Sequence, residues 1–151
     1  MKKGLIVLAV MLLVLVTGCA SSKEEKMVCT RTSTMNKIEL DLNYQVYYQG
    51  DVVTKVQTTE KITSTSKETL ATYKQAVEDL YSNFDDIKHY NYDITIEGDT
   101  LTSKTDINYS KININDLLKI DSSIEQLLNE NNKISLEKIT QVYESTGAIC
   151  K

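Results

Sequence analysis

The chain has no proline, no tryptophan, one phenylalanine and one histidine among its 151 residues. With His89 as the single histidine, neither an H-E-x-x-H zinc motif nor any cluster of histidine ligands is present. The five glycines form no glycine-rich phosphate loop, and the G-x-S-x-G motif of serine hydrolases is missing. Because these catalytic and nucleotide-binding motifs are missing, we expect a protein that is not an enzyme and uses no cofactor.

Basic residues are too few to suggest a nucleic-acid partner. The 17 Lys and Arg residues are outnumbered by 21 Asp and Glu residues, which gives a formal net charge of -4, whereas nucleic-acid binding depends on neutralising phosphates. A metal patch of His89 with Asp85, Asp86 and Asp93 is a weaker interpretation than a solvated connection, because scattered carboxylates with one histidine are unspecific ligands. We therefore expect neither nucleic acid nor a bound metal.

The N-terminal 18 residues have the organisation of a bacterial lipoprotein signal peptide. Lys2 and Lys3 precede an uncharged apolar run over residues 5–16, a length typical of a signal peptide and short for a membrane span. The run leads into a sequence that resembles the lipobox, in which the cysteine thiol is acylated and the chain is cut before it: Val16, Thr17, Gly18 and Cys19. An uncleaved anchor and ordinary secretion are the alternatives.

This interpretation divides the chain into a signal peptide over 1–18, a lipidated cysteine with a charged tether over 19–26, and one domain over 27–151. Acyl chains on Cys19 would hold the domain at the extracytoplasmic face of a cell membrane. The proline-free composition, rich in Lys, Asn and Ile, favours an AT-rich genome and therefore a Gram-positive host.

Cys29 and Cys150 remain as a pair once Cys19 carries lipid. An exported compartment permits disulfides, and two cysteines allow one intramolecular pairing, which would close a loop of about 120 residues. Free thiols, an intermolecular bridge and a metal site are the alternatives, although the pair lacks CxxC spacing. We expect a structural disulfide that ties the start of the domain to its end.

Alternating apolar and polar residues over 38–48 predict a long half-buried strand. Gly50-Asp51 supplies a turn into a Val- and Thr-rich return strand, and Cys29 lies in a preceding strand. A second hairpin over 90–109 repeats this plan around Gly98-Asp99. The two hairpin units predict an antiparallel sheet in which each strand has one apolar face.

Helices are predicted after each hairpin unit. Thr65-x-x-Glu68 has the form of a capping box, Asp85-Asp86 ends the helix, and its apolar stripe is Leu70, Tyr73, Val77, Leu80, Tyr81 and Phe84. Short helical pieces follow near 115–120 and 122–129, and Ser135 caps a last helix that ends near Gly147. Because each strand has one apolar face, we expect the helices on one face of the sheet, which makes an α+β two-layer sandwich.

The chain contains nine tyrosines, which we interpret first as sheet residues, because tyrosine suits half-buried strands. Six of them form a candidate ligand face: Tyr44, Tyr47, Tyr48, Tyr90, Tyr92 and Tyr109. A concave pocket lined by Tyr47 and others would favour a small ligand, whereas a flat, helix-covered sheet would favour a protein partner.

The lipobox, the charged tether, the long strand with its Gly-Asp turn, the amphipathic helix and the second hairpin together resemble the YehR-like family of small bacterial lipoproteins. The resemblance covers most of the chain after the signal peptide and rests on layout. It implies an α+β domain on a lipid anchor, without an assigned activity or catalytic residues. We expect a membrane-anchored, non-enzymatic binding or accessory module. The alternatives are an envelope structural or interaction protein with a protein partner, and an enzyme with an unrecognised site.

Overall fold

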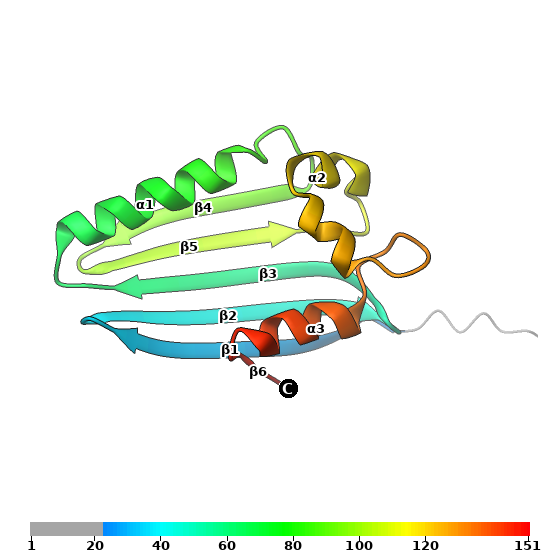
Figure 1. The fold of residues 1–151 in the computed structure, drawn as a ribbon, viewed down its shortest axis with the longest axis horizontal. Helices are drawn as coiled ribbons and strands as arrows, with labels where there is room; N and C mark the ends of the chain where they lie inside the picture. Colours follow the sequence, from blue (N-terminus) through cyan, green and yellow to red (C-terminus); the bar gives the residue numbers. More distant parts are fainter. Residues whose placement is uncertain (1–22) are drawn as a thin grey trace, which may run out of the picture.

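The computed structural model describes residues 23–151, which form one antiparallel six-stranded sheet and a layer of helices (Figure 1). The elements are β1 (Glu25–Met35), β2 (Ile38–Gln49), β3 (Val52–Thr63), α1 (Lys67–Ser82), β4 (Tyr90–Glu97), β5 (Thr100–Ile107), α2 (Ile114–Ile120), the 3-10 helix η1 (Ser122–Leu127), α3 (Leu136–Ser145) and β6 (Ile149–Cys150). The predicted α+β fold class is confirmed. The predicted signal peptide and the lipobox residues Val16, Thr17, Gly18 and Cys19 lie outside the described residues.

The strand order in the sheet is β4-β5-β3-β2-β1-β6. β1, β2 and β3 form the predicted meander, and β5 pairs with β3 so that the second hairpin extends the sheet. The first strand begins at Glu25 and therefore includes two residues of the predicted tether. β6 pairs with β1 at the edge and brings the end of the chain beside its first strand.

The three hairpins use two kinds of tight turn. Gly50 and Gly98 each occupy the first position of a two-residue loop with a positive φ, 61° and 63°, a backbone conformation that glycine adopts without steric penalty. The first hairpin instead turns through Asn36 and Lys37 with φ of 50° and 66°. Two positive φ angles in succession are typical of a type I′ turn, which matches the twist of the flanking strands.

The first helix begins one residue later than the sequence predicts. Ser66, not Thr65, is the N-cap, and its Oγ accepts a hydrogen bond from the backbone N–H of Thr69 at 3.2 Å. The predicted capping box of Thr65 and Glu68 is therefore wrong. The helix starts at Lys67, so the residue directly before it is Ser66, whose hydroxyl serves as the N-cap. The helix ends at Ser82, before the predicted end at Asp85-Asp86.

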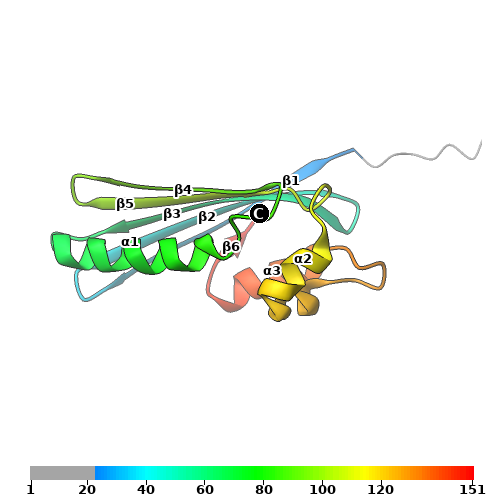
Figure 2. The ribbon, with the colours of Figure 1, turned by 90° about the horizontal axis from the view of Figure 1, so that it is seen from above.

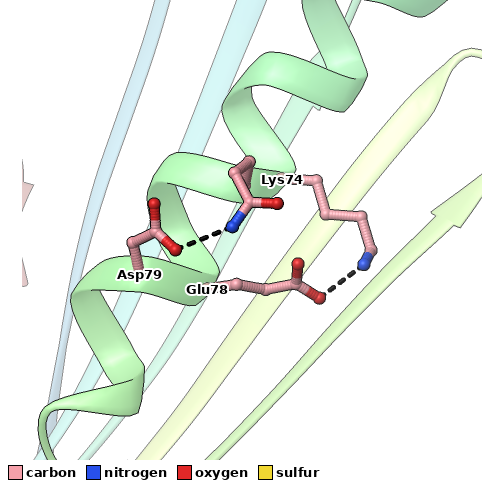
Figure 3. A network of polar contacts seen from close by, with 4 residues as sticks. Lys74, Glu78 and Asp79 are labelled. Carbon is pink, nitrogen blue, oxygen red and sulfur yellow. Dashed lines mark hydrogen bonds and ion pairs between the residues drawn. The ribbon is translucent and has the colours of Figure 1, made fainter.

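The buried side of α1 is narrower than the predicted stripe. Leu70 is buried, whereas Leu80 is 57% exposed and Tyr73 is 37% exposed. On its polar surface the helix carries two side-chain pairs at i, i+4 spacing: an ion pair between Lys74 and Glu78, and a hydrogen bond from Gln75 Nε2 to Asp79 Oδ1 of 2.7 Å (Figure 3). Each such pair stabilises a helix by about 0.2–0.5 kcal/mol.

The helices of residues 23–151 all lie on the same side of the sheet (Figure 2). Two separate clusters of buried apolar residues lie between the layers. The α1 core consists of Ile62, Leu70 and Leu101, and the α3 core consists of Val46, Val53, Val56, Leu128, Ile134 and Ile139. Burying one such side chain fully stabilises the folded state by about 1.5–3 kcal/mol. The apolar residues of the two clusters therefore determine which face of the sheet the helices cover. No helix within residues 23–151 is long and apolar enough to cross a membrane.

Candidate functional site

The face of the sheet opposite the helices is left uncovered by residues 23–151 (Figure 2). Because side chains alternate along a strand, the residues between the helix-covered positions all point to this side. We call it the open face, and it comprises Lys26, Val28, Thr30, Thr32 and Thr34 of β1, Glu39, Asp41, Asn43, Gln45 and Tyr47 of β2, Lys55, Gln57, Thr59, Lys61 and Thr63 of β3, Thr100, Thr102, Lys104 and Asp106 of β5, and Asn91, Asp93, Thr95 and Glu97 of β4. Val28 and Tyr47 are its apolar and aromatic members.

A shallow trough crosses the open face from β4 to β1. It consists of two adjoining hollows of about 380 Å³ and about 400 Å³ that share Gln45 and Thr59. Its side chains belong to three neighbouring cross-strand rows: Asn91, Asp106, Gln57 and Gln45; Asp93, Lys104, Thr59, Asn43 and Thr30; and Lys61, Asp41 and Thr32. The trough therefore follows the hydrogen-bonding direction of the sheet, across five strands.

Gln57 lies on β3, the middle one of the five strands that the trough crosses, and is held by its neighbours. Its Nε2 donates a hydrogen bond of 2.6 Å to Asp106 Oδ2, and its Oε1 lies 3.1 Å from the hydroxyl of Tyr47. That hydroxyl also lies 3.3 Å from Gln45 Oε1, and Lys55 Nζ lies 4.1 Å from the centroid of the Tyr47 ring, a cation–π contact. These contacts hold the Gln57 amide in a defined orientation and place the Gln45 amide beside the Tyr47 hydroxyl.

The charges of the trough alternate in sign. Asp93 is opposite Lys104, and Asp41 is opposite Lys61; with Asp106 the trough has three aspartates and two lysines, and charges of both signs lie close together. The uncharged positions offer amide and hydroxyl groups, which both donate and accept hydrogen bonds. Such a surface can bind a polar molecule of low charge.

The six predicted tyrosines do not share one face. Tyr47 alone is on the open face, whereas Tyr44, Tyr48, Tyr90 and Tyr92 belong to the covered side, and Tyr109 follows β5 and packs against the α3 core. Tyr44 stacks on Tyr143 of α3 with ring centroids 4.0 Å apart. Desolvation raises the pKa of Tyr109 to about 12. These rings pack the two layers together, in the sheet role that we considered first.

The covered face also contains a polar layer between its two cores. Glu60 of β3 is half-buried there, and its carboxylate accepts a hydrogen bond of 3.3 Å from Ser103 Oγ, whose residue is 1% exposed. Burial raises the pKa of Glu60, and the Ser103 hydrogen bond opposes that shift. Burial, followed by the charge of Glu60, raises the pKa of Tyr44. Perturbed groups of this kind mark functional sites or structural networks, and Glu60 lines neither hollow of the trough.

Cys29 and Cys150 form the disulfide that the sequence predicts, across a sequence separation of 121. They are directly opposite one another on β1 and β6, with Cα atoms 4.0 Å apart, and Cys29 is fully buried. Among residues 23–151, no three His, Cys, Asp or Glu side chains gather as a metal site. His89 lies in the connection between α1 and β4 with a φ of 70°.

The trough was missed by the sequence-based choice of site residues, which followed the tyrosines. The sequence did contain a sign of it, namely the polar residues that alternate with the apolar ones along each strand. Asn43 and Gln45 of β2, like Gln57 and Thr59 of β3, point to the open face. Their alignment depends on strand order and register, which bring β3 next to β5.

The fold and the open face define a class: a single α+β sandwich with helices on one side and a polar sheet face on the other. The chain belongs to the family described as "Protein of unknown function (DUF1307)", whose model matches residues 29–148. The resemblance to the YehR-like family is confirmed by this match together with the structural likenesses described next.

Two solved structures share the fold. An NMR structure of the YehR protein of E. coli has a TM-score of 0.55 at 20% identity, over 84% of this chain and 91% of that chain. An NMR structure of a protein from Streptococcus pneumoniae TIGR4 has a TM-score of 0.52 at 12% identity, over 100% of this chain and 97% of that chain. A comparison with curated proteins gives no match. At these identities the likeness shows the fold alone.

Proposed function

We propose that this protein is a lipid-anchored, extracytoplasmic binding module whose ligand occupies the open face, and that it catalyses no reaction. The single observation that carries the proposal is the trough across the open face, which is lined by oriented polar side chains and left uncovered by the helices. Antiparallel sheets commonly pack one face on the core and leave the other in solvent, so the hydrogen-bonding groups of the trough are accessible to a ligand.

The proposed anchor is close to the domain. β1 begins at Glu25, six residues after Cys19, and a fully extended chain of that length spans about 20 Å. An acylated Cys19 would therefore keep the domain beside the membrane, where two or more acyl chains provide stable attachment. The Cys29–Cys150 disulfide supports an oxidising, extracytoplasmic location.

Two measurements test these proposals separately. Intact-mass spectrometry of the full chain purified from bacterial membranes should show a diacylated N-terminal Cys19, and a Cys19→Ser variant should lose both the acyl mass and membrane retention. An intact signal segment on the wild-type protein would contradict the anchor.

Photocrosslinking in intact cells tests the binding face. A benzophenone amino acid at Thr95, which is exposed on the open face and borders the trough without lining it, should form an adduct. The same group at Gln75, exposed on α1, is the matched control. Equal labelling from both positions, or adducts from Gln75 alone, would refute binding at the open face.

A further inference from the structure

We propose that the trough binds an uncharged, hydroxyl-rich glycan chain that lies across the strands; this inference rests on the proposed function and names its ligand class. The groups that line the trough match the chemistry of sugar hydroxyls. A hydroxyl both donates and accepts a hydrogen bond, and an Asn or Gln side chain offers both capacities within one planar group. Four such side chains, Asn43, Gln45, Gln57 and Asn91, line the trough, with carboxylates beside them as further acceptors.

One of these amides, Gln57, is ordered in advance of binding. Gln57 is held by Asp106 on one side and by the Tyr47 hydroxyl on the other, so its orientation needs no further ordering by a ligand. Side chains that are ordered before association reduce the entropic cost of binding. This saving in entropy matters most for a ligand rich in hydroxyl groups. Each hydrogen bond that such a ligand forms replaces a hydrogen bond to water and therefore contributes little net free energy of binding.

The charge pattern argues against a charged ligand. Three aspartates and two lysines line the trough, and Lys104 and Lys61 are each opposite an aspartate, Asp93 and Asp41, so a polyanion or a polycation would meet charges of both signs along it. A phosphate polymer requires an excess of Lys and Arg. An uncharged chain meets no such penalty.

The shape of the trough fits an elongated ligand. It crosses five strands, a distance of about 19 Å at the usual strand spacing, which accommodates several pyranose rings in a row. An extended peptide is a poorer fit, because peptides pair with free sheet edges and place their side chains in apolar pockets. The trough lies on the face of the sheet, and its lining residues are polar apart from Leu42 and Tyr92, which alternate with the open-face positions of β2 and β4.

The proposal is tested by calorimetric titration of the full chain in detergent micelles with two neutral probes, chitotetraose and cellotetraose. At least one of them should bind. Gln57→Ala should weaken that binding about five- to tenfold, the value of one lost hydrogen bond, and Asn91→Ala should act in the same direction. Gln75→Ala on α1 removes an equivalent amide outside the trough and should leave the affinity unchanged. A thermal melt shows whether Gln57→Ala impairs folding. If it does, Asn91→Ala still tests the proposal, because Asn91 is exposed and its truncation should leave the fold intact.

Salt dependence separates the ligand classes. Glycan affinity should change less than twofold between about 50 mM and about 500 mM salt, because no ion pair is formed. The proposal is overturned by a lack of binding to both probes, by equal losses in the trough variants and in Gln75→Ala, or by binding that falls steeply with salt and requires Lys61 and Lys104. The photocrosslink at Thr95 does not depend on these probes, so failure of the ligand class and failure of the binding face are distinguishable.

Discussion

The carboxylate of Glu60 accepts its hydrogen bond from Ser103 Oγ at 3.3 Å on the face of the sheet that the helices cover. The pair is in register on β3 and β5 and separates the α1 core from the α3 core. Because desolvation raises the pKa of Glu60, the folded state prefers its protonated form more strongly than the unfolded state does.

This relationship predicts a pH-dependent contribution to stability from Glu60. A carboxyl with a raised folded pKa contributes stability below its unfolded pKa, about 4.3, and loses it as the pH rises through the folded pKa. Glu60→Gln removes the charge and keeps the shape, so it should raise the free energy of unfolding at neutral pH and leave it nearly unchanged at pH 4. Urea unfolding at a series of pH values measures both. Glu39→Gln, exposed on β2, is the matched control, and identical pH profiles for Glu60→Gln and the wild type would disprove the assignment.

The observed N-cap of α1 predicts different effects for two adjacent hydroxyl residues. Ser66 Oγ accepts from the Thr69 N–H, whereas Thr65 is exposed and makes no capping contact. Ser66→Ala should reduce stability by about 0.5–2 kcal/mol, and Thr65→Ala should change it by less than about 0.5 kcal/mol. Thermal unfolding of the two variants shows which hydroxyl caps the helix. A larger loss of stability in Thr65→Ala than in Ser66→Ala would show that Thr65 is the N-cap.

Much of the fold was predictable because its signals are local. The alternation over 38–48 and the Gly-Asp turns predicted two hairpin units, and Ser135 and Gly147 marked the last helix correctly. The hairpin turn at Asn36-Lys37 was not predicted, since it lacks the glycine that usually marks a type I′ turn. The exposure of Leu80 could not be predicted either. Helical periodicity shows which side of the helix is apolar, but it does not show how much of that side the sheet covers.

The candidate site depended on long-range information. Gln57 and Asp106 are 49 residues apart and meet because β5 pairs with β3, a choice that hairpin signals do not contain. The tyrosines were more conspicuous in the sequence, yet most of them pack between the layers. Their positions follow from register, since neighbouring residues such as Tyr47 and Tyr48 point to opposite faces.

The first hairpin turn offers a stabilising substitution. Lys37 has a φ of 66°, a left-handed conformation that costs a residue with a side chain about 1 kcal/mol relative to glycine. Lys37→Gly creates the Asn-Gly pair that type I′ turns prefer and should raise the free energy of unfolding by up to about 1 kcal/mol. Lys23→Gly, in the segment before β1, is the control and should have no such effect. A melting temperature for Lys37→Gly at or below that of the wild type would contradict the prediction.

The disulfide joins the two ends of the domain, so its removal should affect the whole unfolding transition. A Cys29→Ala/Cys150→Ala variant loses a link across 121 residues and should be destabilised by about 2–5 kcal/mol, mainly because its unfolded chain is no longer constrained. Denaturant unfolding with and without reductant measures this. Reductant should lower the midpoint of the wild type, whereas the variant should be insensitive to it. Because β6 consists of two residues beside the edge of β1, the variant should keep the rest of its sheet and its far-ultraviolet circular dichroism. A wild-type protein whose midpoint does not respond to complete reduction would show that the bond adds nothing to stability.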